Sequence, residues 1–331
     1  MSALPSWKFK RVAVFGDAIL DHFSWGDATR ISPEAPVPVV LLERETYGLG
    51  GAANVAANVQ SMGGQAAFYS VVGDDAAGDQ LELMLEQAGI KSGLLRLPAR
   101  MTTVKHRILA QGKHMLRLDR EFCQEIAADC IAEFDRRLAP DWADFAAIAI
   151  SDYAKGLITA PLLEWLSAKA AAHHIPLLMD PKRLNLSFAG VSVLKPNRKE
   201  MEMLSGASFS SIDALVAAGT ALLARHGCQA LLVTLGGEGM LLMNGREEPL
   251  LIPTVAQRVA DVTGAGDTTL AALALGLAAK LDLPTSARLA NVAAGLAVSQ
   301  PGTVAVAWEE LVASPEFEPA LAARRSAEVS R

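Results

Sequence analysis

The sequence predicts an α/β fold with one mostly parallel sheet. Along its 331 residues, short apolar runs alternate with longer, Ala- and Leu-rich segments of helical length. That alternation is typical of right-handed strand–helix–strand units. A second observation is that most of the apolar runs end close to an Asp or Asn. With 51% hydrophobic residues, the chain has ample material for a buried core.

The expected strands and helices follow from run length and from the residues that bound each run. The strands, which are short and end at turn or polar residues, are expected at Val12–Phe15, Ala66–Val72, Phe145–Ile150, Ile175–Met179, Val191–Leu194 and Ala230–Val233. The helices, which are longer, are expected at Ala52–Met62, in a segment that ends at Ala88, at Leu162–Ala172 and at Thr268–Lys280.

Polar residues just past the strand ends point to a ligand. They are Asp17, Asp74, Asp152, Asp180 and Asn197. Any one of them alone is typical of a turn. In an open α/β sheet, however, ligands bind at the carboxyl ends of the strands. Five such residues at one edge therefore favour a polar, hydroxyl-rich ligand.

Two segments, approximately 22–48 and 101–120, do not fit strand–helix–strand units. The first carries three prolines and a β-branched run, and the second is expected to form a hairpin with strands Val104–Ala110 and Met115–Asp119. Both suit a small β-lid over the ligand edge. A flat lid leaves an apolar edge exposed, which predicts a homodimer through the lid. Because no linker or repeat interrupts the chain, we expect residues 1–331 to form a single domain.

Composition narrows the class of protein. The net charge of −6 disfavours nucleic acid and anionic membranes as partners. The apolar stretch Leu270–Ala279 is too short to span a bilayer, which needs about 20 residues. Met1–Arg11 has no apolar core of a signal peptide. The three cysteines form no CxxC pair, as expected for reduced thiols. These observations predict a cytoplasmic protein.

The most informative stretch precedes the last expected helix. Gly264, Ala265 and Gly266 bring free backbone N–H groups to a helix N-terminus, which is a ready anion site. Asp267 follows them directly. An ordinary N-cap is the alternative interpretation, but a cap needs neither two glycines nor a second carboxylate, Asp261, six residues upstream. The pattern predicts phosphoryl transfer, with a carboxylate that accepts the proton of an attacking hydroxyl.

These residues carry a family resemblance. Asp261–Asp267 resembles the C-terminal signature of the ribokinase-like (PfkB) carbohydrate kinases, Gly50–Asn54 resembles their N-terminal signature, and Asn197–Glu200 resembles their NxxE motif. The three motifs stand in the order of that family, and the resemblance covers nearly the whole chain. It implies a three-layer fold with a central, mostly parallel sheet and a β-lid. It also implies transfer of a phosphoryl group from ATP to a sugar hydroxyl.

The resemblance implies a role for each matching residue. Asp267 is the catalytic base, and Gly264–Gly266 form the anion hole. Asn197 and Glu200 organise Mg²⁺ through water and bind the nucleotide. The other nucleotide-binding residues implied are Thr234, Gly236, Gly239 and, on a helix before a C-terminal strand region, Asn291. Asp261 and Thr263 stand where the family has its monovalent-cation (K⁺) loop, and the implied ligands of the sugar hydroxyls are Asp17, Gly51 and Asn54.

Within the family, the sequence most resembles the D-glycero-β-D-manno-heptose-7-phosphate kinases. The resemblance lies in Gly16–Asp21, Arg30–Val39, Ser151–Gly156 and Asp180–Lys182. It implies phosphorylation at O1 to the 1,7-bisphosphate, on the route to ADP-heptose and lipopolysaccharide core. Many such kinases are fused to a nucleotidyltransferase with an HxGH motif. Since the sequence has no HxGH, we expect a stand-alone kinase and the nucleotide-transfer step on another protein.

A phosphorylated sugar needs cations in its site. The candidates are Arg107 and Arg117 on the expected lid, with Lys155 and Lys182 near strand ends. We also assign Asp152 to the substrate site, from its place at a strand end. Each of these charges alone is typical of a solvated surface.

Other functions fit less well. Gly48–Ala53 fits the GxGxxA pattern of dinucleotide-dependent oxidoreductases, but that fingerprint belongs directly after the first strand. The sequence lacks the GxxxxGK[ST] of P-loop kinases and the GxSxG of hydrolases. A non-catalytic sugar-binding module would lack the base that Asp267 supplies. Kinases of ribose, fructose 6-phosphate, adenosine or ketodeoxygluconate remain alternatives within the family.

Overall fold

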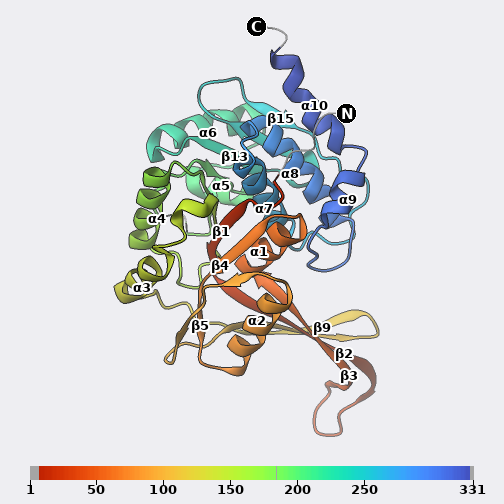
Figure 1. Ribbon diagram of the computed structural model, residues 1–331. Coiled ribbons are helices and arrows are strands. Elements are labelled where there is room, and N and C mark those ends of the chain that lie inside the picture. The colour runs from red at the N-terminus through yellow and green to blue at the C-terminus, as the bar shows by residue number, and fades with distance from the viewer. Residues whose placement is uncertain (1–6, 184, 329–331) are drawn as a thin grey trace.

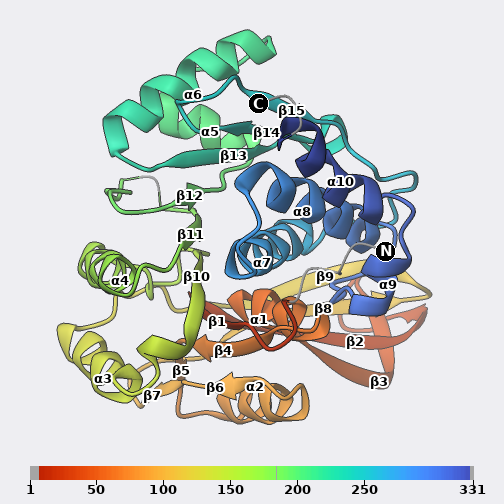
Figure 2. The same ribbon diagram turned by 45° about the horizontal axis from the view of Figure 1, so that its top comes forward.

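The computed structural model describes residues 7–183 and 185–328, with a large central sheet between two layers of helices (Figures 1 and 2). Within these residues nine strands form that sheet. In spatial order they are β15 (Leu250–Ile252), β14 (Met240–Met243), β13 (Ala230–Thr234), β12 (Val193–Leu194), β11 (Leu177–Asp180), β10 (Phe145–Ser151), β1 (Arg11–Gly16), β4 (Gln65–Tyr69) and β6 (Lys91–Ser92). All neighbours from β13 to β6 are parallel. β14 is antiparallel to both β13 and β15, so it alone runs against the direction of the other described strands. The predicted mostly parallel sheet is confirmed.

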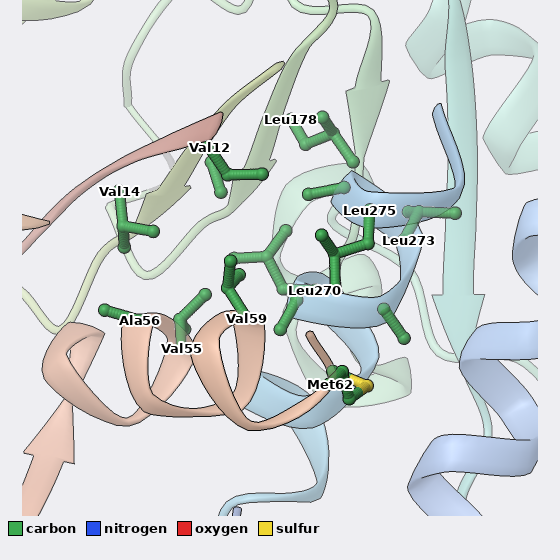
Figure 3. Packing of buried hydrophobic residues seen from close by; sticks show 14 of the residues in the cluster. Val12, Val14, Val55, Ala56, Val59, Met62, Leu178, Leu270, Leu273 and Leu275 are labelled. Atoms are coloured by element: carbon green, nitrogen blue, oxygen red, sulfur yellow. The ribbon is translucent and has the colours of Figure 1, made fainter. Parts of the chain in front are cut away.

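Both faces of the sheet are covered by helices, because the central strands are apolar on both sides. On β1, Val12 and Val14 face one layer, and Ala13 and Phe15 face the other. The first layer contains α1 (Ala52–Ser61), α7 (Ala265–Ala278) and α8 (Leu283–Val298). The second contains α3 (Ala128–Leu138), α4 (Ala160–His173), α5 (Arg198–Ser205) and α6 (Ile212–His226). Figure 3 shows the first layer, in which α1 and α7 pack together beneath β1.

Two sequence predictions need correction. The apolar run 66–72 is not one strand, because β4 ends at Tyr69 and β5 (Val71–Gly73) pairs with β7 (Leu95–Leu97) in a separate sheet. Asp74 therefore follows a strand of that small sheet, and its exposed carboxylate lies 3.9 Å from a guanidinium nitrogen of Arg96. The second correction concerns the C-terminus. Two helices, α9 (Trp308–Ala313) and α10 (Phe317–Glu328), follow α8 in place of the expected strand region.

The predicted lid is a second sheet of four strands. Its order is β3 (Pro38–Gly51), β2 (Ala18–Ile31), β8 (Thr103–Ala110) and β9 (Lys113–Arg120). The long β2–β3 hairpin projects beyond the body of the molecule (Figure 1). Gln111 and Gly112 join β8 to β9 with φ of 51° and 73°, the left-handed pair that a tight two-residue hairpin requires. The lid begins at Ala18, earlier than the sequence suggested, and α2 (Ala76–Gln87) packs near its base.

Strand alternation gives the lid two faces. What we call the inner face carries Asp21, Phe23, Lys105, Arg107 and Arg117, which the register places side by side. What we call the outer face carries His22, Ser24, Glu45, His106 and Leu118. Hydrogen bonds from Thr263 are the main cause that lowers the pKa of Asp261, in the loop before α7, and the charge of Arg107 on the inner face adds a smaller contribution.

Candidate active site

The predicted anion site lies at the N-terminus of α7, at the carboxyl edge of the sheet. Gly264 is its N-cap, with a φ of 81° that favours glycine, and Asp267 is its third residue. Within residues 7–183 and 185–328, the backbone N–H groups of Gly264, Gly266 and Asp267 have no protein acceptor. Such N–H groups, together with the helix dipole, favour a bound anion.

Asp267 is 4% exposed and accepts hydrogen bonds from two side chains. Asn54 Nδ2 donates to its Oδ2 at 2.9 Å, and the Tyr153 hydroxyl lies 2.9 and 3.0 Å from the two carboxylate oxygens. Burial raises the pKa of Asp267 to about 7, against the opposing effect of these two donors. The charge of Asp180 raises the pKa further, and that of Lys195 lowers it. A carboxylate with a pKa near neutrality can accept a proton from an alcohol and release it again.

Asn54 has a different place from the one expected. It was predicted to bind sugar hydroxyls, but its amide donates to Asp267, and its Oδ1 accepts from Asn58 Nδ2 at 3.2 Å. Asn58 is itself held by Thr268 Oγ1 at 3.0 Å and by the Val306 N–H at 3.2 Å. This buried network fixes the orientation of the Asp267 carboxylate. Asn54 is a positioning residue in this arrangement.

Asp17 also differs from its prediction as a free bidentate acceptor. It is 2% exposed, and its carboxylate accepts three backbone N–H groups, those of Tyr153 at 2.9 Å, Lys155 at 3.0 Å and Leu157 at 3.0 Å. These three amides use most of its acceptor capacity, and its role toward sugar hydroxyls stays a prediction. By holding this loop, Asp17 brings the Tyr153 hydroxyl to Asp267.

Asp152 likewise binds backbone. Its Oδ1 accepts the Ala154 N–H at 2.8 Å, and its Oδ2 accepts those of Lys182 and Arg183 at 3.0 and 2.6 Å. Burial raises the pKa of Asp152, although these three donors oppose the rise. The residue joins the loops after β10 and β11 through these contacts, and its assignment to the substrate site stays a prediction.

A buried ion pair lies beside the anion site, and the sequence prediction missed it. Lys195 Nζ is 2.7 Å from Asp180 Oδ2, and the Lys195 side chain is only 2% exposed. A side chain at Gly266 would begin 3.5 Å from both charged groups. The available signal was a lysine directly after a buried strand, because a buried lysine requires a partner. The pair places the Lys195 ammonium group, together with the Asp180 carboxylate, below the N-terminus of α7.

The NxxE motif forms a capping box at the start of α5. Asn197 Oδ1 accepts the Glu200 N–H at 2.9 Å, and Glu200 Oε2 accepts the Asn197 N–H at 2.9 Å. Glu200 Oε1 also lies 3.1 Å from Lys182 Nζ. These are the hard oxygen donors that Mg²⁺ prefers. Because both Glu200 oxygens already accept hydrogen bonds, they fit an ion that keeps its own water shell.

A pocket of about 310 Å³ opens against the first turn of α7. Of the predicted nucleotide-binding residues, those that line it are Thr234, Gly236, Gly239 and Asn291, with Ala265 and Gly266 from the anion site. Gly239 has a φ of 99°, and a side chain there would collide with the carbonyl of Ile252. Asn291 shapes the wall by donating to the Pro253 carbonyl at 2.7 Å. The pocket joins an apolar slot to a set of free N–H groups, which suits a flat base carrying phosphates.

Comparison with known proteins places the chain in a family. It matches the model of the pfkB family of carbohydrate kinases over residues 10–310. It belongs to that family. The chain is therefore a phosphotransferase whose acceptor is an alcohol (hydroxyl) group of a sugar. The family implies ATP with a divalent metal ion.

The relatives of this pfkB kinase agree in sequence and in fold. It is 42% identical over 306 residues to the "Bifunctional protein HldE" of Pelobacter propionicus, a match that covers 90% of this chain and 62% of the relative. The chain thus spans less than two thirds of that protein. Its fold is similar to that of Arabidopsis thaliana ribokinase complexed with ribose and ATP (TM-score 0.71, 19% identity, 92% and 98% of the two chains covered). It is also similar to phosphofructokinase-2 from Escherichia coli in complex with potassium (0.76, 18%, 95% and 99%). The ribokinase-like fold is confirmed.

The expected monovalent-cation loop of the pfkB kinase is closed on itself. Asp261 Oδ1 accepts the N–H and the hydroxyl of Thr263 at 2.9 and 2.7 Å, and its Oδ2 accepts the Gly302 N–H at 3.1 Å. These hydrogen bonds lower the pKa of Asp261. The carboxylate therefore ties the loop before α7 to the chain after α8. Its role as a cation ligand stays a prediction.

The four cations expected to bind a sugar phosphate already have carboxylate partners. These pairs are Arg107 with Asp21, Arg117 with Asp119 at 2.9 Å, Lys155 with Glu121 at 2.7 Å and Lys182 with Glu200 at 3.1 Å. A substrate phosphate would have to share or displace a carboxylate at each of them. Arg107 differs from Arg117 and Lys182 because its side chain is only 16% exposed, and it also lies over the Phe23 ring at 5.1 Å.

Asp21 is a site residue to which the sequence prediction gave no role. It is 5% exposed, and a side chain at Gly50 would begin 2.5 Å from its Oδ2. Burial is the main cause that raises the pKa of Tyr153, and the charge of Asp21 adds a smaller contribution. The sequence offered one signal for Asp21, namely its place at the end of the Gly16–Asp21 stretch, four residues after Asp17. Gly51, which ends β3, is the N-cap of α1 with a φ of 57°.

A membrane-spanning helix is not found in the part of the chain that the structure describes: none of its helices has the length and apolarity to cross a bilayer.

Proposed function

We propose that this pfkB kinase transfers the γ-phosphoryl group of ATP to O1 of D-glycero-β-D-manno-heptose 7-phosphate, giving the 1,7-bisphosphate. The observation that carries the proposal is the convergence at α7. A carboxylate with a pKa of about 7 stands beside unpaired N–H groups, next to a pocket lined by Thr234, Gly236, Gly239 and Asn291. A base, an anion site and a lid are the parts that transfer to a sugar hydroxyl requires.

The proposed reaction needs one proton acceptor. As O1 attacks the γ-phosphorus, the new O–P bond forms, the bond to the ADP oxygen breaks, and the O1 proton passes to an Asp267 carboxylate oxygen. Asn54 and Tyr153 hold that carboxylate in place. The N–H groups at Gly264 and Gly266 would stabilise the charge on the transferring group. Asn197 and Glu200 would hold magnesium through water, and the ion would neutralise phosphate charge there.

Three observations support the heptose substrate. The segments Arg30–Val39, Ser151–Gly156 and Asp180–Lys182 resemble those of heptose-7-phosphate kinases. The chain is 42% identical to a "Bifunctional protein HldE". The inner lid face also presents Lys105, Arg107 and Arg117. We propose that Asp21 accepts sugar hydroxyls in the place first assigned to Asp17. Another sugar or sugar phosphate, such as ribose or fructose 6-phosphate, is the alternative.

A panel assay tests the substrate. ADP release, measured with free and phosphorylated sugars, should be fastest with heptose 7-phosphate. Arg107→Gln should raise KM for that substrate by roughly 10- to 150-fold, because a charge-assisted contact contributes about 1.5–3 kcal/mol. The KM for ATP should change less. Arg136→Gln, on an exposed arginine of α3, is the matched control and should change neither value.

Two results would count against this assignment. If ribose or fructose were turned over better than heptose 7-phosphate, the family would stand and the substrate would fall. If Arg107→Gln raised the KM for phosphorylated and for unphosphorylated heptose equally, Arg107 would serve only to position Asp21.

We also propose that the lid pairs two copies of the chain. Three leucines on its outer side are about half exposed: Leu42 (52%), Leu116 (52%) and Leu118 (49%). Covering them in a dimer removes apolar surface from water. Light scattering should give twice the chain mass at micromolar concentration, and Leu116→Lys with Leu118→Lys should give the single mass. A monomeric wild-type protein with an ordered lid would refute the pairing.

Several sequence expectations stay predictions: the single kinase domain over 1–331, the cytoplasmic location, the K⁺ requirement at Asp261 and Thr263, and a nucleotide-transfer step carried by another protein. Since the curated relatives are longer than this chain, each needs a test on the whole protein.

A further inference from the structure

The outer face of the lid holds a cluster of metal-ligating side chains that the kinase reaction does not use. His22 Nε2 lies 2.8 Å from Glu45 Oε1, and the Ser24 hydroxyl lies 3.1 Å from the same oxygen and 2.7 Å from His106 Nε2. The ligand atoms of His22, Glu45 and His106 all lie within 4.8 Å of one another. The three residues come from three strands, β2, β3 and β8.

The strand register fixes this arrangement. His22 pairs with His106 across the parallel β2–β8 ladder, and Ser24 pairs with Glu45 across the antiparallel β2–β3 ladder. The two imidazoles stack with centroids 3.9 Å apart and an interplanar angle of 9°. Tyr47 stacks on His22 at 4.5 Å. The two rings therefore lie parallel, with His22 Nε2 at Glu45 and His106 Nε2 at Ser24, and Ser24 in turn donates to Glu45.

We propose that this cluster is a binding site for a divalent transition-metal ion such as Zn²⁺, with His22 Nε2, His106 Nε2 and a Glu45 oxygen as its protein ligands. Two imidazoles and one carboxylate suit zinc and its neighbours rather than Mg²⁺ or Ca²⁺, which prefer oxygen. Bonds of about 2.0–2.1 Å in a tetrahedral site bring ligand atoms to about 3.3 Å apart, and each imidazole nitrogen binds a metal in the plane of its own ring. To share one ion, the two stacked rings would therefore have to turn out of their parallel arrangement. Water takes the fourth position, since the Glu45 side chain is 41% exposed.

The neighbouring groups complete the site. Ser24 is 6% exposed and donates to Glu45, so it orients the carboxylate from the outer shell. A shallow cavity of about 530 Å³, lined by His22, Tyr47, His106 and residues of α2, gives an ion a route to the cluster.

A bound ion would fasten the three lid strands together. His22 follows Asp21 directly in β2, and His106 precedes Arg107 directly in β8. The ion on the outer face would therefore hold the two backbone segments that present the Asp21–Arg107 pair on the inner face. The site itself does not depend on which sugar the kinase uses.

Calorimetric titration of the full, chelator-treated chain with ZnCl₂ tests the proposal. We expect one ion per chain. His106→Asn and Glu45→Gln should each weaken Zn²⁺ binding by at least about 100-fold, and Ser24→Ala by about 10- to 100-fold, the range for loss of an outer-shell partner. His114→Asn, on an exposed histidine of the same lid, and Cys123→Ser, on the exposed thiol, are matched controls and should bind as the wild type does.

Thermal unfolding gives a second measurement that does not depend on kinase activity. Zn²⁺ should raise the Tm of the wild type, because a ligand of the folded state stabilises it, and should leave the Tm of Glu45→Gln unchanged. Glu45 is exposed, so this variant should fold like the wild type without metal. The proposal is overturned if the wild type binds no Zn²⁺ at millimolar concentration. It is also overturned if binding persists in both Glu45→Gln and His106→Asn, or disappears in Cys123→Ser.

Discussion

Asp267→Asn should lower kcat by about 10²-fold or more while leaving the fold and ATP binding intact, which is the usual scale for loss of a general base. The amide has nearly the volume of the carboxylate and can still contact Asn54 and Tyr153, but it cannot accept the proton of the sugar hydroxyl. Steady-state kinetics and ATP titration of the variant check this. Turnover within a factor of three of the wild type would remove Asp267 from its proposed role.

The dependence of wild-type kcat/KM on pH tests the role of Asp267 in a second way. Only the ionised carboxylate accepts a proton, so wild-type kcat/KM should rise with pH through about 7, the pKa of Asp267. The Tyr153 hydroxyl lowers that pKa by donating to the charged form. Tyr153→Phe should therefore move the rise to higher pH. Tyr47→Phe, on the outer face of the lid, should leave the profile unchanged.

Lys195→Met should reduce the free energy of unfolding by about 3–5 kcal/mol, because removing one partner of a buried ion pair leaves the other charge without compensation. Lys195 is 2% exposed and contacts Asp180 at 2.7 Å. Chemical denaturation measures the loss. Lys199→Met, four residues later on the exposed side of α5, is the matched control and should stay within about 0.5 kcal/mol of the wild type.

The double variant separates the pair from its surroundings. Asp180→Asn combined with Lys195→Met should cost less than the sum of the two single changes, because no isolated charge remains. A loss below 1 kcal/mol for Lys195→Met alone would contradict the assignment. In the kinase assay, Lys195→Met alone should move the rise of kcat/KM to higher pH, since the charge of Lys195 lowers the pKa of Asp267.

Much of the fold could be predicted because its signals are local. A short apolar run beside Gly and Asp marks a strand end, and Gly264 with Gly266 marks a helix start, whatever the rest of the chain does. The split of the run 66–72 was hidden, because apolar character does not reveal which sheet a strand joins. The pattern indicated two lid segments, the second of them a hairpin, but not that their pairing places Asp21 and Arg107 together.

The site was predictable in position but not in contacts. The sequence places Asp17 at a strand end, yet whether its oxygens meet a sugar or a loop depends on the backbone amides of Tyr153, Lys155 and Leu157, more than a hundred residues away. The contact of Asn54 with Asp267 was hidden for the same reason, since its partner lies on α7, 213 residues away. Tyr153 was overlooked because only the folded loop brings its hydroxyl to Asp267.

The pairing of β2 with β8 also limits how the length of the lid can change. Neighbouring residues on these strands have opposite surroundings, with Asp21 and Arg107 facing inward and His22 and His106 facing outward. Inserting or deleting one residue in either strand would turn its side chains to the other face, so that imidazoles would replace the acid and base on the inner face. The exposed tip 32–37 between β2 and β3 lies beyond the paired segments, so a change of length there would leave the register of β2 with β8 unchanged.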